Sequence, residues 1–335
     1  MSARRIIPRR ERRRAALTVL ALATLLAAAL LVLYGWESRQ TAAVDPGYTP
    51  GLNLTRPLQE VTWQGRTYRQ RQGVTTWLFI GVDQSGEALG TDSYIGGGQG
   101  DVQLVLAVDD DAQTWQLLQL DRDTMADIPV LGVRGDVVGT VHEQLCMAHS
   151  YGNGRQQSCE NNVNTVSVLL NGQSIDGYLA LNMDAVSVLT ELVGGVTVTV
   201  TSDFSAVDPS LEQGCQLTLN GEQALTFVRA RRGVDDETNA ARMARQRAYL
   251  SALRSCGALR QEGFAVRAGE ALSPYMVSNI PSGTAQKLLD KLNTYRRLEP
   301  CTLSGESRVE EGHWAFYPDE DSLWQTILTL FYEPV

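Results

Sequence analysis

Six arginines lie within residues 225–247 of this sequence, in the segment LTFVRARRGVDDETNAARMARQR. They are Arg229, Arg231, Arg232, Arg242, Arg245 and Arg247. A guanidinium stays charged at physiological pH, and its planar fork of N–H donors can grip two phosphate oxygens at once. The same segment contains Asp235, Asp236 and Glu237, so the alternative is a solvated face of surface ion pairs, which add little stability. The segment is therefore either a cradle for a polyanion or a charged surface.

Part of this segment is predicted to place polar side chains on one face of a helix. Residues 240–256 are expected to be helical, and Arg242, Arg245 and Gln246 fall at positions i, i+3 and i+4 of that helix. Residues at these spacings are neighbours on a helix surface. We therefore predict that the three side chains face one anion-binding pocket.

Three further arginines are expected to converge on this helix face. They are Arg122, Arg229 and Arg231. Such a cluster of guanidiniums would have to be neutralised by a polyanion. By contrast, Arg232 and Arg247 are expected to be ordinary surface residues.

Acidic residues lie at the ends of predicted strands. The short apolar run TTWLFIGVD is typical of a buried strand, and it ends in Asp83. Residues 101–124 hold two apolar runs separated by a turn-forming acidic segment, which is the pattern of a β-hairpin. Asp101 lies at the entrance of this hairpin, and Arg122 and Asp123 lie at its exit.

The rest of the chain alternates helical and strand patterns. The predicted helices are residues 161–172, 183–195, 219–231, 281–295 and 321–332, and the predicted strands are residues 196–200 and 313–318. Strands interleaved with helices predict an α/β layered fold with a central sheet.

The distribution of charge argues against a general nucleic-acid binder. The 335-residue chain has a net charge of -9, although its first 14 residues carry seven arginines against one glutamate. A nucleic-acid-binding body would need an excess of basic groups. The sequence also lacks GxSxG, P-loop, HExxH and GxGxxG motifs, and its three histidines are scattered. Common hydrolase, nucleotide-binding and zinc-protease classes are therefore not indicated.

The N-terminal region predicts a membrane anchor. Residues 15–36 contain no charged side chain, and at about 1.5 Å per helical residue they span roughly the 30 Å hydrocarbon core of a bilayer. The preceding arginines place the N-terminus in the cytoplasm and the body outside. A cleaved signal peptide is the alternative, although this apolar segment is longer than the usual signal core. We therefore predict a basic arm (residues 1–14), an anchor (15–36), an extracytoplasmic linker (37–73) and one folded domain (74–335).

Five cysteines are present without any CxxC pair, which argues against a zinc or thioredoxin-type motif. Cys146 and Cys159 flank a glycine-containing loop. A disulfide between them would suit an oxidising compartment outside the membrane. The odd count leaves at least one thiol unpaired within the chain.

Seven segments occur in the order and spacing of the LytR-CpsA-Psr family, which this chain therefore resembles. They are LFIGVD, GDVQLVLAVD, LDRDT, MAHSYGNG, GYLALNMDAVSVLTELVGGVTV, LNGEQALTFVRARR and ARMARQR. The similarity is strong over roughly residues 75–255 and continues weakly to the C-terminus. Each segment is modest alone, but seven in register are specific.

The resemblance implies a mixed central sheet between helical layers and a membrane-anchored phosphotransferase outside the cytoplasm. Such proteins are similar in moving an anionic glycopolymer from a polyprenyl diphosphate carrier to a peptidoglycan sugar hydroxyl through a phosphodiester. Members of the family hold the lipid in an apolar pocket and the diphosphate on arginines, together with a divalent ion, usually Mg²⁺.

The resemblance also implies roles for individual residues. The residues expected to act in catalysis are Arg122, Asp123, Arg229, Arg231, Arg242 and Gln246. The diphosphate is expected on Arg122, Arg229, Arg231 and Arg245. Asp83 and Asp101 are expected near the metal, where either could instead take the proton of the acceptor hydroxyl.

The chain departs from the family pattern in three places. Gln99 and Gly100 replace the usual basic residue and Ser or Thr before the second acid, and Asp121 replaces a proline before Arg-Asp. Where relatives read Asp-x-Gly-Arg, this chain has Asn239-Ala-Ala-Arg242. These changes leave the predicted charged cluster in place but alter the loops around it.

Two other functions are compatible with the arginines alone. A membrane-tethered module could bind anionic glycans or polyprenyl diphosphates without turnover, and it would need the arginines but not the acids. A hydrolase could release the lipid carrier without joining the glycopolymer to an acceptor. A transcription regulator is disfavoured, because the body is acidic and predicted to be exported.

Overall fold

The computed structural model describes residues 57–88, 97–132, 135–261 and 264–335. Its centre is a mixed sheet with the strand order β11-β8-β3-β4-β5-β12, in which β13 also pairs with β5. The bounds of its strands are β3 (Val74–Val82), β4 (Gly100–Asp109), β5 (Thr114–Leu120), β8 (Gly177–Asn182), β11 (Met276–Ser278), β12 (Arg296–Arg297) and β13 (Cys301–Thr302). β3, β4 and β5 are antiparallel neighbours, whereas β8 is parallel to β3. The predicted central sheet and the hairpin of residues 101–124 are thus confirmed.

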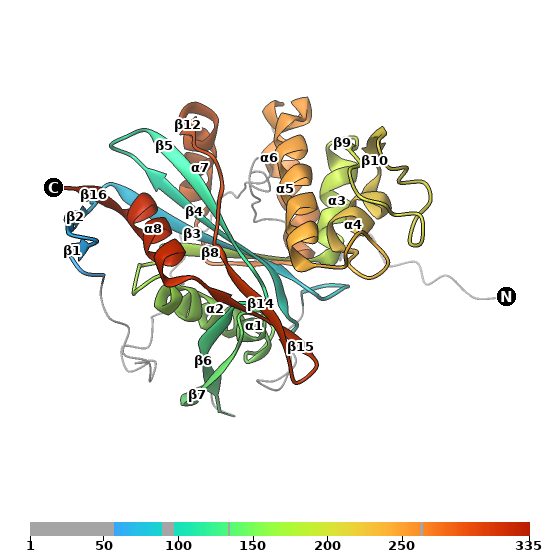
Figure 1. The fold of residues 1–335 in the computed structure, drawn as a ribbon. Helices are drawn as coiled ribbons and strands as arrows, with labels where there is room; N and C mark the ends of the chain where they lie inside the picture. Colours follow the sequence, from blue (N-terminus) through green and yellow to red (C-terminus); the bar gives the residue numbers. More distant parts are fainter. Residues whose placement is uncertain (1–56, 89–96, 133–134, 262–263) are drawn as a thin grey trace.

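Helices cover both faces of this sheet (Figure 1). On one face lie α3 (Met183–Leu192), α4 (Gly221–Arg229), α5 (Asn239–Ser255), α6 (Phe264–Leu272) and α7 (Ser282–Thr294). On the other face lie α1 (Met147–Ser150), α2 (Gln156–Leu169) and α8 (Glu320–Phe331). Short 3₁₀ turns at Gly257–Arg260 and Ser273–Tyr275 flank α6. The expected arrangement of a sheet between helical layers is confirmed.

The strand β3 shows why the sheet is covered twice. Successive side chains of a strand point to opposite faces, and in β3 both sets are apolar. Trp77 and Phe79 pack into the core under α3 to α6, whereas Leu78 and Ile80 pack into the core with α2 and α8. A continuous apolar run therefore produces a strand buried on both sides.

Local signals set the helix ends next to the site. Asn220 and Gln223 form a capping box at the start of α4, in which each side chain bonds the other's backbone N–H. Thr238 caps α5 by accepting a hydrogen bond from the N–H of Ala241 at 3.2 Å. A short connection joins the end of α4 to the capped start of α5. The two helices lie next to each other.

In the described part of the chain, three two-stranded antiparallel sheets lie outside the central sheet. They are β6 (Met125–Leu131) with β7 (Val137–Gln144), β9 (Val196–Thr199) with β10 (Gln216–Leu219), and β14 (Gly305–Glu310) with β15 (His313–Pro318). The sequence predicted β9 and β15 but not β6 and β7. Thr124 bridges to Phe316, so β15 lies beside the exit of the central hairpin.

The predicted start of the folded domain near residue 74 is too late. β1 (Glu60–Trp63) and β2 (Arg66–Gln70) form a hairpin that pairs with β16 (Tyr332–Pro334) at the other end of the chain. Val61 is buried in the core that contains Tyr332. This segment resembles a linker because it is mostly polar, and its folding partner lies more than 250 residues away in the sequence.

The predicted arm and anchor, residues 1–36, lie outside the described residues, as does most of the predicted linker. Among the residues that the structure does describe, no helix is both long and apolar enough to cross a bilayer.

Candidate functional site

The central strands bring the predicted acids together. Val82 of β3 pairs with Gly100 of β4, so Asp83, directly after β3, and Asp101, near the start of β4, lie toward the same end of these two strands. β5 finishes with Leu120 at that end, because it runs antiparallel to β4. The turn that follows β5 therefore delivers residues 121–123 to this place.

A buried carboxylate bridges two arginines at the centre of the site. Asp101 accepts a hydrogen bond from Arg242 Nη1 on its Oδ2 at 2.9 Å, and its Oδ1 accepts one from Arg122 Nη1. The Arg122 and Arg242 side chains are only 14% and 6% exposed. Two guanidiniums from distant parts of the chain are thus held by one shared counter-charge.

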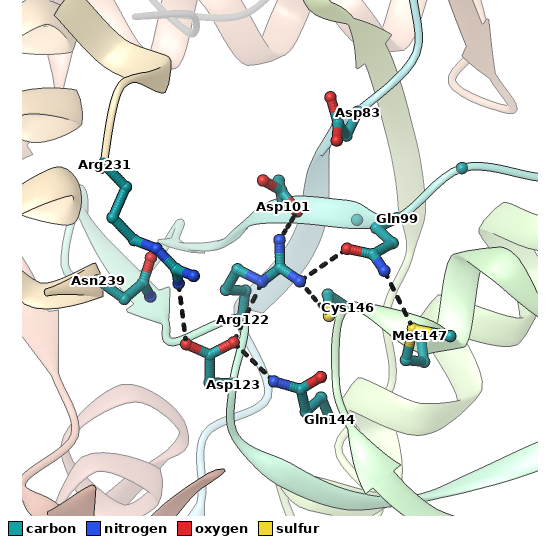
Figure 2. Close-up of polar contacts among 12 residues, drawn as sticks. Asp83, Gln99, Asp101, Arg122, Asp123, Gln144, Cys146, Met147, Arg231 and Asn239 are labelled. Atoms are coloured by element: carbon teal, nitrogen blue, oxygen red, sulfur yellow. Dashed lines mark hydrogen bonds and ion pairs between the residues drawn. The ribbon is translucent and has the colours of Figure 1, made fainter. Parts of the chain in front are cut away.

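Asp123 forms a second junction (Figure 2). Its Oδ1 accepts hydrogen bonds from Arg122 Nε at 3.2 Å and from Gln144 Nε2 at 2.9 Å. Its Oδ2 lies 3.7 Å from Arg231 Nη1. Arg122 also donates to Gln99 and to the sulfur of Cys146. Arg122 therefore uses four of its five N–H bonds on protein acceptors and acts mainly as a scaffold for Asp101 and Asp123.

The rim of the site is more open. Arg229 Nη2 donates to Asp83 Oδ1 at 3.2 Å, and these side chains are 52% and 39% exposed. Arg231 is also partly exposed. An ion pair in such contact with water is weak, so Arg229 and Arg231 can turn to an incoming anion at little cost.

The expectation that only a polyanion could neutralise the arginines is wrong. Arg122, Arg229, Arg231 and Arg242 are each within ion-pair distance of a carboxylate of the protein. The sequence could not show this, because the acids come from strands far from the arginines in the chain. An anionic ligand must therefore compete with, or share, these existing pairs.

Burial perturbs two of the acids. It raises the pKa of Asp121 above the ordinary value for aspartate, and it raises the pKa of Asp123, which the nearby Asp121 charge raises further. Arg122 and Arg242 oppose both shifts. These carboxylates therefore take up protons at a higher pH than exposed aspartates do.

An apolar cavity opens beside the arginines. The volume open to water inside it is about 90 Å³. Its apolar walls include Phe79, Leu104, Leu181, Val186, Val228 and Leu250, and its polar lining consists of Asp101, Asn182, Arg229, Arg242 and Gln246. The site thus combines an apolar cavity with a few charged and polar side chains in its lining.

Gln246 connects the lining of the cavity to β5 and α4. Its Oε1 accepts a hydrogen bond from Gln119 at 2.9 Å, and its Nε2 donates to the carbonyl of Val228 at 3.2 Å. Gln119 also accepts from Arg247 at 2.6 Å. Arg247 is therefore half-buried and bonded, which differs from the expected surface position, whereas Arg232 is exposed as expected.

Arg245 does not join the predicted cradle. Its guanidinium is 2% exposed and donates to Asp235 and to the carbonyls of Phe227 and Ala230. Three residues advance an α-helix by about 300°, so Arg245 lies about 60° from Arg242 around the axis. That offset turns it toward the end of α4, where it bonds the helix terminus.

Replacing Arg245 should therefore affect stability more than ligand binding. For Arg245→Ala we expect a loss of about 3 kcal/mol, because Asp235 and two carbonyls lose a buried donor, and hence a Tm lower by about 6–12 °C. Calorimetry checks this value, with exposed Arg232→Ala as control. Diphosphate affinity measured at 10 °C should change less than about fivefold. Lost affinity with an unchanged Tm would instead place Arg245 in the anion site.

The acids fit a metal ion only in combination with a substrate. Within the described ranges, no group of three or more His, Cys, Asp or Glu side chains could hold a metal. Asp83 and Asp101 offer two carboxylates on neighbouring strands. Mg²⁺ is commonly bound through one or two carboxylates together with substrate phosphates and water. Both oxygens of Asp101 already accept hydrogen bonds from arginines, so a Mg²⁺ ion here would depend mainly on Asp83 and on substrate phosphates.

The expected disulfide is absent, because both cysteines are free thiols. Cys146 contacts Arg122 Nη2 at 3.1 Å, and burial raises its pKa to about 12. Cys159 lies 4.0 Å from His149 Nε2 instead. The two sulfur atoms thus contact different side chains and not each other.

Several site residues were not predicted as functional. They are Gln99, Asp121, Gln144, Cys146 and Asn239. Three of them are positions at which the sequence departs from the family pattern, and that departure was the available signal. Gln144 and Cys146 carry no local signal, because their roles arise from packing of β7 and α1 against the turn after β5.

The LytR_cpsA_psr family model matches residues 52–330 of this chain. The chain is 27% identical over 239 residues to a polyisoprenyl-teichoic acid–peptidoglycan teichoic acid transferase TagU of Oceanobacillus iheyensis. That match covers 70% of this chain and 66% of the relative, so the chain spans slightly less than two thirds of the relative's length.

Solved structures share the fold. The TagV structure from B. subtilis has a TM-score of 0.58 at 23% identity, and the match covers 78% of this chain and 96% of that one. The structure of TagT bound to LI-WTA has a TM-score of 0.57 at 21% identity, with coverage of 77% and 90%. These similarities confirm the α/β architecture with its mixed central sheet.

Proposed function

Because this chain belongs to the LytR_cpsA_psr family, we propose that it is a glycopolymer phosphotransferase. It would move an anionic glycopolymer from a polyprenyl diphosphate carrier to a sugar hydroxyl of peptidoglycan. The predicted anchor, residues 15–36, would hold the domain outside the cytoplasm at the membrane surface, where such a lipid carrier is accessible.

The observation that supports this proposal most directly is the position of the apolar cavity. Arg229, Arg242 and Gln246 are among the residues that line it, and the rest of its wall is almost entirely hydrocarbon. A polyprenyl diphosphate has the same division into a long apolar chain and a doubly charged head. Burial of the chain would provide affinity, and the arginines would place the diphosphate at this end of the central strands.

The transfer breaks one bond and forms another at the same phosphorus. The acceptor hydroxyl attacks the phosphorus that carries the glycopolymer, the bond to the bridging oxygen of the diphosphate breaks, and polyprenyl monophosphate leaves. Phosphoryl transfer depends mainly on positioning and on neutralising charge. Arg229, Arg231 and Arg242 would supply donors for this charge, while Arg122 keeps Asp101 and Asp123 in place.

Asp83 is the better placed of the two acids to receive the acceptor proton. Both oxygens of Asp101 are occupied by buried arginines, whereas Asp83 is exposed and weakly paired. A general base must lie within reach of the incoming hydroxyl. When bound, Mg²⁺ would neutralise phosphate charge next to Asp83 and Asp101, held mainly by the substrate diphosphate and water.

A reconstituted reaction tests the proposal. The full-length protein in detergent is incubated with polyprenyl-diphosphate-linked glycopolymer, peptidoglycan and Mg²⁺, and the products are identified by mass spectrometry. We expect polyprenyl monophosphate and a phosphodiester between glycopolymer and peptidoglycan. Release of the lipid without linkage would identify a hydrolase. Tight lipid binding without any product would identify a binding module.

Separate replacement of the acid and the arginine at the rim sharpens this test. For Arg229→Ala we expect about tenfold weaker binding of the lipid diphosphate, as for loss of one charge-assisted hydrogen bond. For Asp83→Asn we expect at least about tenfold slower transfer with binding retained. Titration calorimetry and the transfer assay measure these effects. Unchanged transfer by Asp83→Asn would remove the proton-accepting role.

A further inference from the structure

A carboxylate outside the predicted site is connected to Arg242 through an amide. Asp121 Oδ1 accepts a hydrogen bond from Asn239 Nδ2 at 2.6 Å. Asn239 Oδ1 in turn accepts from Arg242 Nε at 3.0 Å and from Arg242 Nη2 at 2.6 Å. Both Asn239 and Arg242 are buried. One edge of the Arg242 guanidinium is therefore held by an amide that is itself held by an acid.

These contacts are part of a closed ring. The third bonded N–H of Arg242 goes to Asp101, whose other oxygen accepts from Arg122. The ring closes through the turn of residues 121–123, which contains Arg122. In this turn Asp121 Oδ1 accepts a hydrogen bond from the backbone N–H of Asp123 at 2.8 Å. Arg242 uses three of its five N–H bonds within the ring, and the remaining two are available for a ligand. The ring therefore determines which N–H donors of Arg242 can face the cavity that this residue lines.

The ionised acid gives the amide its orientation. An asparagine side chain has a donor end and an acceptor end of nearly equal size. With Asp121 as a carboxylate, the NH₂ of Asn239 faces the acid and its oxygen faces Arg242. The reversed amide would place oxygen against carboxylate and NH₂ against guanidinium, and both contacts would be repulsive. A negative charge at residue 121 thus orders a guanidinium that it does not touch.

Asp121 and Asn239 are two of the positions at which the chain departs from the family pattern. An acid stands at 121 instead of proline, and an amide stands at 239 instead of an acid. Their direct hydrogen bond shows that the two changes are physically connected.

We propose that Asp121 is a positioning residue, which acts through Asn239 to hold the Arg242 guanidinium in the lining of the apolar cavity. Its effect on transfer rests on the proposed function, whereas its effect on Arg242 does not. The charged groups that face Asp121 are Arg122 and Asp123 beside it in the turn and Arg242 from α5.

Reciprocal substitutions provide the test. Asp121→Asn keeps the shape of the side chain but removes its charge, and we expect about tenfold slower transfer. Asn239→Asp places two carboxylates in contact, so one must stay protonated, and we expect a similar loss. The double variant Asp121→Asn/Asn239→Asp keeps one negative charge in the pair and should recover to within about threefold of the parent protein. Losses that simply multiply in the double variant would overturn the proposal.

The pH profile separates this role from simple support of the fold. In the parent protein, transfer should fall as the pH drops through the raised pKa of Asp121, because the protonated acid no longer orients Asn239. In Asp121→Asn, the fall in transfer rate that protonation of Asp121 causes should be missing. The fall that protonation of Asp123 causes should remain. Identical profiles for the two proteins would contradict the proposal.

A second readout is independent of activity. The Nε–H of Arg242 can be observed by ¹⁵N NMR and assigned by its disappearance in Arg242→Lys. We expect its exchange with water to be at least about tenfold faster in Asp121→Asn and to slow again in the double variant. If this pattern appears but no variant performs transfer, the positioning role stands and the proposed function fails. Unchanged exchange in Asp121→Asn would reject the positioning role itself.

Discussion

Asp101→Asn should slow glycopolymer transfer about 10³-fold and yet strengthen the binding of inorganic diphosphate in the absence of Mg²⁺. The parent carboxylate holds Arg122 and Arg242 together, and both guanidiniums are almost fully buried. An asparagine keeps the size but presents an NH₂ group to one guanidinium. Loss of aligned donors at a transition state typically costs about 10²–10³ in rate, and here two arginines are released at once.

The gain in binding follows from the charge balance of the site. Asp101 repels an incoming anion as well as neutralising the arginines, so its removal leaves positive charge that a diphosphate can satisfy. We expect several-fold tighter binding by calorimetry without Mg²⁺. The same variant should lose about 3 kcal/mol of stability, because two buried guanidiniums lose their shared partner.

The exposed acid Asp127 provides the matched control. Among the described residues its ion-pair partner is His142 on the β6–β7 hairpin, and both side chains are more than half exposed. Asp127→Asn should therefore change neither rate nor binding by more than about twofold. If Asp101→Asn loses diphosphate binding in step with its rate while remaining folded, the carboxylate is not the counter-charge described here.

Filling the cavity should weaken lipid binding without affecting the anion site. Val186 lines the apolar wall on α3 and is only partly buried. For Val186→Phe we expect about 10²-fold weaker binding of a polyprenyl diphosphate, because about three or four methylenes of the chain are displaced at roughly 0.8 kcal/mol each. Affinity for inorganic diphosphate should remain within about twofold.

Comparison of the two ligands makes this result specific. Val138→Phe adds the same ring at a position that is 69% exposed on β7, away from the cavity, and should leave both affinities unchanged. Thermal unfolding of each variant checks that the fold is retained. Equal weakening for both ligands would indicate a distorted site, and no weakening for either would show that the lipid chain binds elsewhere.

Local patterns predicted most of the elements around the site. Local patterns include the apolar run of β3, the turn between β4 and β5, and the helical patterns of residues 219–231 and 240–256. Each depends on residues close together in the chain, so it can be recognised in the sequence. The hairpin of β1 and β2 could not be recognised in this way. Its stability depends on β16, which follows almost the whole domain in the chain.

The sequence by itself determined the chemical types of the site: arginines that cannot lose their charge, acids at strand ends, and the helix that carries Arg242 and Gln246. Only the tertiary structure decided how these groups pair. It placed Asp101 between Arg122 and Arg242, turned Arg245 toward the end of α4, and connected Asp121 to Asn239. The physical reason is that ion pairs and hydrogen bonds between distant segments depend on distances of a few tenths of an ångström, which the packing of sheet against helices sets and no local pattern contains.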